Sequence, residues 1–259
     1  MLKAGLLEMV NYQDLLVNLV VRNITVRYKR SFIGIIWTMI NPFVNTLVMT
    51  IVFSTLFRFS TKDYVIYFLS GIQLWNFFSA SSIESSRCIT LNGDLLKKVY
   101  IPKAIFVIAV VLSELVNFFL ALVPLLVLLP FFGKGSLPAL LFLPIPLLIA
   151  VAFTLGISFL LAAAPVFFYD IGETYRLLVV PWLYLTPIIY PVEIIPEKFL
   201  PIIKLNPMYY IVECFRSPLY QGQIPDLLHL LGAAIPALII LVIGYKVFTD
   251  WSDDFIFYI

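Results

Sequence analysis

The segment "GDLLKKVYIPKAI" (93–105) concentrates charged side chains in a sequence that has few of them. Charged residues make up 12% of the chain, whereas apolar residues make up 62%. Clustered ammonium groups can bind lipid headgroups or a partner protein, and an excess of Lys and Arg also sets the orientation of a membrane protein. We consider both roles for the connection 84–103, whose residues of interest are Asp94, Lys97, Lys98, Tyr100, Pro102 and Lys103.

The sequence lacks the side-chain patterns of common enzymes. It contains no GxxxxGK[ST] phosphate loop, no G-x-S-x-G elbow and no HExxH or Cys/His metal pattern, and its one histidine is His229. A membrane enzyme usually retains several ionisable groups inside its spans because buried charges are costly. Here only Glu114 lies deep in an apolar run. We therefore expect no catalytic residue, no metal site and no cofactor bound by this chain.

Glu114 itself allows two interpretations. It can line a polar path, or it can join helices as a hydrogen-bonded carboxylate with Asn117, one turn away on the same helix face. We expect no second carboxylate or basic residue at the same depth, so the pattern favours the structural role.

Aromatic residues are the clearest positive signal inside the apolar runs. Trp and Tyr also gather at membrane interfaces, and that ordinary belt explains most of the tyrosines. It explains Trp37, Trp182 and Tyr184 less well, because each lies a turn or more inside its run. Aromatic faces suit stacking against sugar rings in a water-filled path, so we predict that these three face a conduit between two subunits. The full set of candidate path residues is Trp37, Trp75, Phe77, Trp182, Tyr184 and Tyr190.

These side chains must be positioned by membrane-spanning helices. A helix needs about 20 mostly apolar residues to cross the hydrocarbon, and barrel strands of about 10 residues cannot explain runs of this length. We therefore predict an all-α integral membrane protein of six transmembrane helices. The predicted spans are 32–57, 64–83, 104–131, 139–165, 177–190 and 230–249.

The segment 11–30, before the first predicted span, has the pattern of an amphipathic helix. Its polar residues recur at three- and four-residue steps, with leucines and valines between them. We expect it to lie in the headgroup layer, although a helix docked on the protein gives the same pattern. This region lacks the continuous apolar core of a cleavable signal peptide, so we expect the first span to be retained.

The distribution of Lys and Arg predicts the orientation. The segment 1–30 and the connection 84–103 hold most of the basic residues, which places both termini in the cytoplasm. In this topology Cys88 and Cys214 fall on opposite membrane faces, so they cannot form a disulfide with each other.

The apolar stretch 190–229 is divided into pieces of about a dozen residues at most by Pro191, Pro196, Pro201, Pro207 and Pro218. Such pieces are too short to span and are typical of re-entrant or interfacial segments. We predict a re-entrant helical hairpin, with helices near 196–204 and 207–217, that forms an outer gate before the last span. Its basic residues should reach the outer headgroups or the conduit rim; they are Lys198, Lys204 and Arg216.

Several stretches together resemble one family, the membrane subunits of ABC-2-type polysaccharide exporters, and within it the O-antigen and teichoic-acid exporter permeases. They occur in the family's order across nearly the whole sequence, so we expect one transmembrane domain over 1–259. The stretches are "RYKRSFIGIIWTMINPF" (27–43), "GIQLWNFFSASS" (71–82), "NGDLLKKVYIPK" (92–103), "PIIYPVEIIP" (187–196) and "LNPMYYIVECFR" (205–216).

The resemblance implies a homodimer of six-helix subunits with two copies of a separate ATPase that binds the ATP. It implies export of a lipid-linked polysaccharide across the bacterial inner membrane, and a coupling helix in the connection 84–103 that seats in the ATPase. Two alternatives stay open: an ABC-2 exporter of small drugs or lipids, and a membrane-embedded glycosyltransferase or polymerase.

Overall fold

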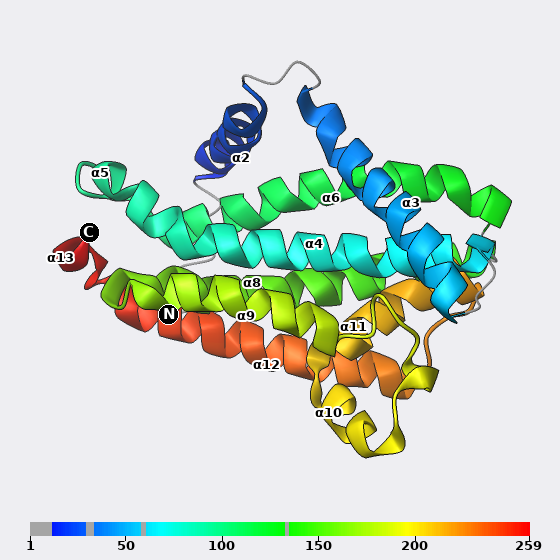
Figure 1. Ribbon diagram of the computed structural model, residues 1–259. Helices are drawn as coiled ribbons and strands as arrows, with labels where there is room; N and C mark the ends of the chain where they lie inside the picture. The colour runs from blue at the N-terminus through cyan, green and yellow to red at the C-terminus, as the bar shows by residue number, and fades with distance from the viewer. Residues whose placement is uncertain (1–11, 30–33, 58–60, 133–134) are drawn as a thin grey trace.

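The computed structural model describes residues 12–29, 34–57, 61–132 and 135–259 and is predominantly helical in these ranges, with no strand (Figure 1). The first half comprises α2 (Gln13–Tyr28), the 3-10 turn η1 (Gly34–Ile36), α3 (Trp37–Phe57), α4 (Thr61–Leu91), α5 (Gly93–Leu96) and α6 (Ala104–Phe132). The second half comprises α7 (Leu137–Phe142), α8 (Pro144–Phe167), α9 (Asp170–Leu185), η2 (Val192–Ile194), η3 (Glu197–Phe199), α10 (Leu200–Leu205), α11 (Pro207–Arg216), the π-helical turn η4 (Ser217–Gln221), α12 (Leu227–Ser252) and α13 (Phe255–Tyr258).

Four helical segments in the described ranges are long and apolar enough to cross a membrane. They are Gly34–Phe53, Ala104–Phe131, Leu137–Phe167 and Leu227–Ser252, and they match four of the six predicted spans. The predicted span 64–83 lies within α4, which is long enough but carries amide and hydroxyl side chains near its middle. The number of six spans therefore stays a prediction.

The predicted span 177–190 has the wrong bounds. The helix at this place, α9, begins at Asp170 and ends at Leu185, and residues 186–190 form turns. The residue before a proline is disfavoured in helical conformation, and Pro187 accordingly follows an extended Thr186. With 16 residues, α9 is shorter than the length that a perpendicular crossing requires.

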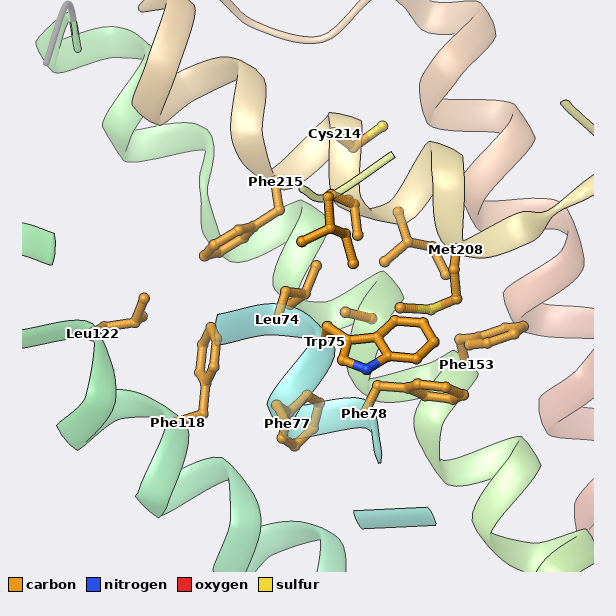
Figure 2. Packing of buried hydrophobic residues seen from close by; sticks show 14 of the residues in the cluster. Leu74, Trp75, Phe77, Phe78, Phe118, Leu122, Phe153, Met208, Cys214 and Phe215 are labelled. Carbon is orange, nitrogen blue, oxygen red and sulfur yellow. The ribbon is translucent and has the colours of Figure 1, made fainter. Parts of the chain in front are cut away.

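The central core is formed by α4, α6, α8, α11 and α12. Aromatic and aliphatic side chains of α4 meet those of α6, α8 and α11 in one cluster, and Figure 2 shows Trp75 and Phe78 of α4 beside Phe153 of α8 and Met208 of α11. The second cluster lies where α5 and α13 meet the ends of α4, α6 and α8. Cys214 belongs to the first cluster and Cys88 to the second, and both are free thiols.

The closest helix pair is α8 and α12, which cross at two glycines. A Cβ atom on Gly156 would lie 2.5 Å from the carbonyl carbon of Ile240, and one on Gly244 would clash with the carbonyl oxygen of Gly156. Small residues allow backbones in membrane bundles to approach each other in this way. This pair runs the length of the bundle and connects its two ends (Figure 1).

The predicted helix 11–30 is present as α2, which packs against α6. Leu19 is buried in this contact, while Val17, Val21 and Val26 stay exposed. One face is thus docked on the protein, and Val17 and Val21, which lie one turn apart, leave apolar surface on another side of the helix. Its position in the headgroup layer stays a prediction.

Candidate functional site

The connection between α4 and α6, residues 92–103, forms a small platform at one end of the bundle. Its apolar side chains Leu96 and Ile101 are buried, and Gly93 packs against Ile259 at the C-terminus. The predicted coupling residues face the other way. Asp94, Lys97, Lys98 and Tyr100 are exposed, Tyr100 by 83%, and Pro102 is half-buried.

Two contacts attach this platform to the rest of the molecule. Lys103 donates a hydrogen bond to the backbone carbonyl of Ser252 at the end of α12, and its ammonium lies 5.8 Å from the ring centroid of Phe255. Burial lowers the pKa of Lys103, against the opposing effect of the nearby carboxylates of Asp253 and Asp254. Unlike Lys97 and Lys98, Lys103 therefore has a structural role.

The second attachment comes from α2. The Arg22 guanidinium donates a 2.9 Å hydrogen bond to Oδ1 of Asn92, which also donates from Nδ2 to the carbonyl of Cys88 at 2.7 Å. Asn92 is the residue before α5. Through this contact, a displacement of the platform would also act on α2.

The environment of Glu114 is the main correction to the sequence analysis. Its carboxylate is buried on α6 and forms a two-pronged ion pair with Arg27 of α2, whose Nη1 donates to Oε2 at 3.0 Å. Asn117 donates to Glu114 at 3.1 Å, as expected. The expectation that no basic residue reaches this depth was wrong, because Arg27 extends inward from the end of a docked helix. Glu114 thus joins helices.

The six candidate path residues differ in how much of each aromatic ring is exposed on the surface of one chain. Trp75 and Phe77 are 3% exposed and belong to the core, where Trp75 packs edge-on to Trp182 at 6.0 Å between ring centroids. Trp182 also donates to Oδ1 of Asn206 at 3.0 Å. Trp37 and Tyr184 are 48% and 58% exposed. Tyr190 is partly buried and donates to the carbonyl of Tyr184 at 2.5 Å.

A groove of about 570 Å³ opens between α3, α4 and α6. Figure 1 shows α3 leaning across the other two helices. Trp37 and the paired Arg27 and Glu114 are among its lining residues, and much of the remaining wall is polar. The uncharged polar lining residues are Tyr28, Thr38, Asn41, Asn45, Gln73, Asn76, Ser79 and Asn117. Apart from Asn117, sequence analysis missed this set, although amides in the middle of apolar helices were its visible signal.

The segment after α9 contains the two predicted helices, α10 and α11, joined at Asn206 and Pro207 as expected. Asn206 is its junction: Oδ1 accepts from the backbone of Met208, and Nδ2 donates to Thr186 at 2.8 Å. The two helices differ, because α11 packs into the core while α10 exposes Ile202 and Leu205. A re-entrant arrangement relative to the membrane stays a prediction.

Arg216 was predicted to lie at the headgroups or the conduit rim, and this was wrong. It is 1% exposed and forms a 2.5 Å ion pair with Glu213, one turn earlier on α11. It also donates to the carbonyl of Pro187 at 3.1 Å, and its guanidinium carbon lies 3.7 Å from the ring centroid of Tyr67. Glu213 supplies the counter-charge inside the bundle, so the side chain does not extend to the surface, although Nε and Nη2 are buried without a hydrogen-bond partner among the described residues.

No group of three or more potential metal ligands (His, Cys, Asp or Glu) occurs in the part of the chain that the structure describes. The described part of the chain combines helices able to cross a membrane, a polar groove between them and an exposed platform at one end. The chain belongs to the ABC-2 type transporter family, whose model matches residues 14–220.

The relatives have more specific names. The chain is 30% identical to the O-antigen export system permease protein RfbA of Myxococcus xanthus, over 96% of both chains. It is 28% identical to a protein of the same name from Klebsiella pneumoniae, over 93% of both chains. It is 23% identical to the capsule polysaccharide export inner-membrane protein CtrC of Neisseria meningitidis, over 90% of this chain and 89% of the relative.

Proposed function

We propose that this chain is the transmembrane permease subunit of an ATP-driven ABC exporter. Its cargo is a lipid-linked polysaccharide, an O-antigen or a related surface glycan, which it moves from the cytoplasmic face across the bacterial inner membrane. Similarity over nearly the whole length to a permease named for O-antigen export carries this proposal. The exposed platform and the polar groove are the parts that such a permease requires.

The working unit we propose is two copies of this chain with two copies of an ABC ATPase. ATP would bind and be hydrolysed on the ATPase, so this chain would hold no nucleotide. The exposed face formed by Asp94, Lys97, Lys98 and Tyr100 would seat in the ATPase on the cytoplasmic side, where both termini also lie. A platform anchored through Leu96, Ile101 and Lys103 can transmit displacement because its own backbone is held.

The route of the glycan would follow the exposed aromatic rings. Trp37 and Tyr184 leave ring surface uncovered within one chain, so they are the residues we expect to line a conduit between the two copies. Trp75, Phe77 and Trp182 would support that wall from behind, and Tyr190 would hold the backbone beside Tyr184. The segment 190–229 would form the outer gate, with α10 as its exposed part.

Simultaneous replacement of Lys97, Lys98 and Tyr100 with alanine tests the coupling assignment. We expect the variant to insert and fold, since these side chains are exposed, but to lose polysaccharide export because ATP hydrolysis no longer drives the permease. Export of the lipid-linked glycan and ATPase activity would be measured in vesicles containing both subunits. Normal export with the ATPase still bound would refute the platform as the docking surface.

A matched control is the double replacement of Lys198 and Lys204 with alanine, which removes two lysines from the predicted outer segment. We expect it to leave ATPase coupling unchanged.

Export of a small drug or a free lipid by the wild-type complex, without glycan export, would instead favour the alternative cargo.

A further inference from the structure

The groove between α3, α4 and α6 contains amide side chains at the depth where hydrocarbon is expected. Asn76 lies at the middle of α4, Asn117 lies at the middle of Ala104–Phe131, and Asn45 lies near the middle of Gly34–Phe53. Three helices therefore bring an amide to similar depth in one groove. An amide transferred to an apolar medium without a hydrogen bond costs several kcal/mol, so a lipid tail is an unfavourable occupant.

Two of the groove's amides are explained by contacts between helices. Gln73 of α4 is buried and donates to the carbonyl of Ala121 on α6 at 2.9 Å. Asn117 is buried and bonds to Glu114, and it accepts from Tyr28 at 3.3 Å. Side-chain hydrogen bonds of this kind commonly hold membrane helices together.

The amides of Asn41, Asn45 and Asn76 have no such explanation. All three are exposed. Asn45 donates to Oδ1 of Asn41 at 3.2 Å on the same helix, which leaves donors and acceptors on both side chains. No hydrogen bond holds the side chain of Asn76 among the residues that the structure describes. These groups need polar partners that the folded chain does not supply.

The chemistry of the groove selects the partner. An amide both donates and accepts hydrogen bonds, which matches a sugar hydroxyl. Trp37 offers a half-exposed ring at the same groove, suited to the apolar face of a sugar. The lining charges, Arg27 and Glu114, neutralise each other, so the groove favours an uncharged ligand over a phosphorylated headgroup. Its volume lies within the roughly 300–1,000 Å³ of small-ligand sites.

We propose that this groove, whose wall includes Trp37, binds neutral sugar units of the exported glycan through Asn41, Asn45 and Asn76. The inference rests on the proposed function and adds to it a binding site and the part of the substrate that occupies it. The lipid-linked charged end of the substrate binds elsewhere, and the amides exchange hydrogen bonds with successive hydroxyls as the chain moves.

The first experiment asks whether the groove holds water and sugar. Ser79 lines the groove beside Asn76, so Ser79→Cys introduces a reporter thiol that leaves the amides intact. Leu126→Cys, on the exposed face of α6 and outside the groove, is the matched control. A charged methanethiosulfonate reagent is expected to label Ser79→Cys and not Leu126→Cys in membranes. Failure of the reagent to label Ser79→Cys would overturn the proposal, because the groove would then be filled by lipid rather than water.

Labelling is then compared in cells with and without the first glycosyltransferase of glycan synthesis. The presence of glycan is expected to slow the reaction at Ser79→Cys. Labelling that does not depend on the glycan would overturn sugar binding in the groove, even where export continues and the proposed function holds. Absence of glycan export by the unmodified complex would instead count against the proposed function itself.

The second experiment measures export directly. Asn41→Ala and Asn76→Ala are each expected to slow export by about fivefold, the factor that one lost hydrogen bond corresponds to. Asn76→Gln should recover part of the rate, since it restores an amide. Folded protein is measured alongside by gel filtration. Wild-type export by both alanine variants would overturn the proposal.

Discussion

Arg216 shows how a charged side chain can be retained inside an apolar helix bundle. Glu213 supplies the counter-charge, Pro187 a carbonyl and Tyr67 a ring face, so one guanidinium joins α11 to α4 and to the turn after α9. Guanidinium is suited to this because it is planar, so it can pair with a carboxylate and also stack on an aromatic face. Arg216 thereby fixes the inner end of the segment we propose as the outer gate.

Replacing Arg216 with alanine should therefore lower the free energy of unfolding by about 3–5 kcal/mol, the cost of breaking a buried pair. Arg216→Lys should recover only part of this loss. Unfolding in mixed detergent micelles gives the measurement. The control is Arg87→Ala, which removes an exposed pair with Glu173 and should cost at most about 1 kcal/mol. Equal effects of the two alanine variants would contradict the role assigned to Arg216.

At the scale of elements, the most extensive contact between two helices is that of α8 with α12, and it runs along the length of the bundle. It depends on backbone approach at Gly156 and Gly244, where no side chain fits between the helices. In contrast, α3 and α2 are attached at few points, which leaves the polar groove open beside them. The closely packed pair α8 and α12 holds the bundle together, whereas the less closely packed α3 contributes part of the proposed binding surface.

Gly244→Ala should separate this pair, because its Cβ would clash with the backbone of Gly156. We expect a loss of about 1–3 kcal/mol, typical of overpacking, measured as a shift of the detergent unfolding curve. Gly172→Ala on α9 is the matched control. Its Cβ would lie 3.6 Å from the Ser86 hydroxyl, an ordinary contact, so the exchange should be neutral or stabilise the helix by up to about 1 kcal/mol. A larger loss from Gly172→Ala would refute this reasoning.

At the scale of the whole molecule, α12 sets the distance between the platform and the α10–α11 segment. Tyr210 of α11 packs against Gly232 near the start of α12, and Lys103 bonds to Ser252 at its end. These contacts are separated by about 30 Å at 1.5 Å per residue, which equals the hydrocarbon thickness of a bilayer. The platform and the α10–α11 segment therefore lie at opposite ends of the molecule (Figure 1).

A thiol reagent that cannot cross membranes should therefore distinguish the two ends. Leu205 on α10 is 84% exposed, so Leu205→Cys should react in spheroplasts, whose inner membrane is intact. Lys97→Cys should react only in inverted vesicles or after permeabilisation. The native cysteines are buried and give little background. Reaction of both variants from the same side would contradict the proposed topology.

The sequence by itself determined the features that depend on local composition. Long apolar runs specify helices at Ala104–Phe131 and Leu227–Ser252 because each backbone group must be satisfied inside the segment. The helices α10 and α11 and their joint at Asn206 were also predictable, since prolines interrupt the chain there. Only at 177–190 did the apolar run mislead, because it continued past the point where Pro187 ends the helix.

Only the tertiary structure decided which faces of these helices meet. A helix that is apolar on all sides carries little information about its neighbours, so Trp75 in the core and the exposed Trp37 looked alike in sequence. The same holds for charge: Arg27 and Glu114 are 87 residues apart, and their pairing requires α2 to dock on α6. The amide groove likewise exists only because three helices bring their midpoints together, which no local pattern encodes.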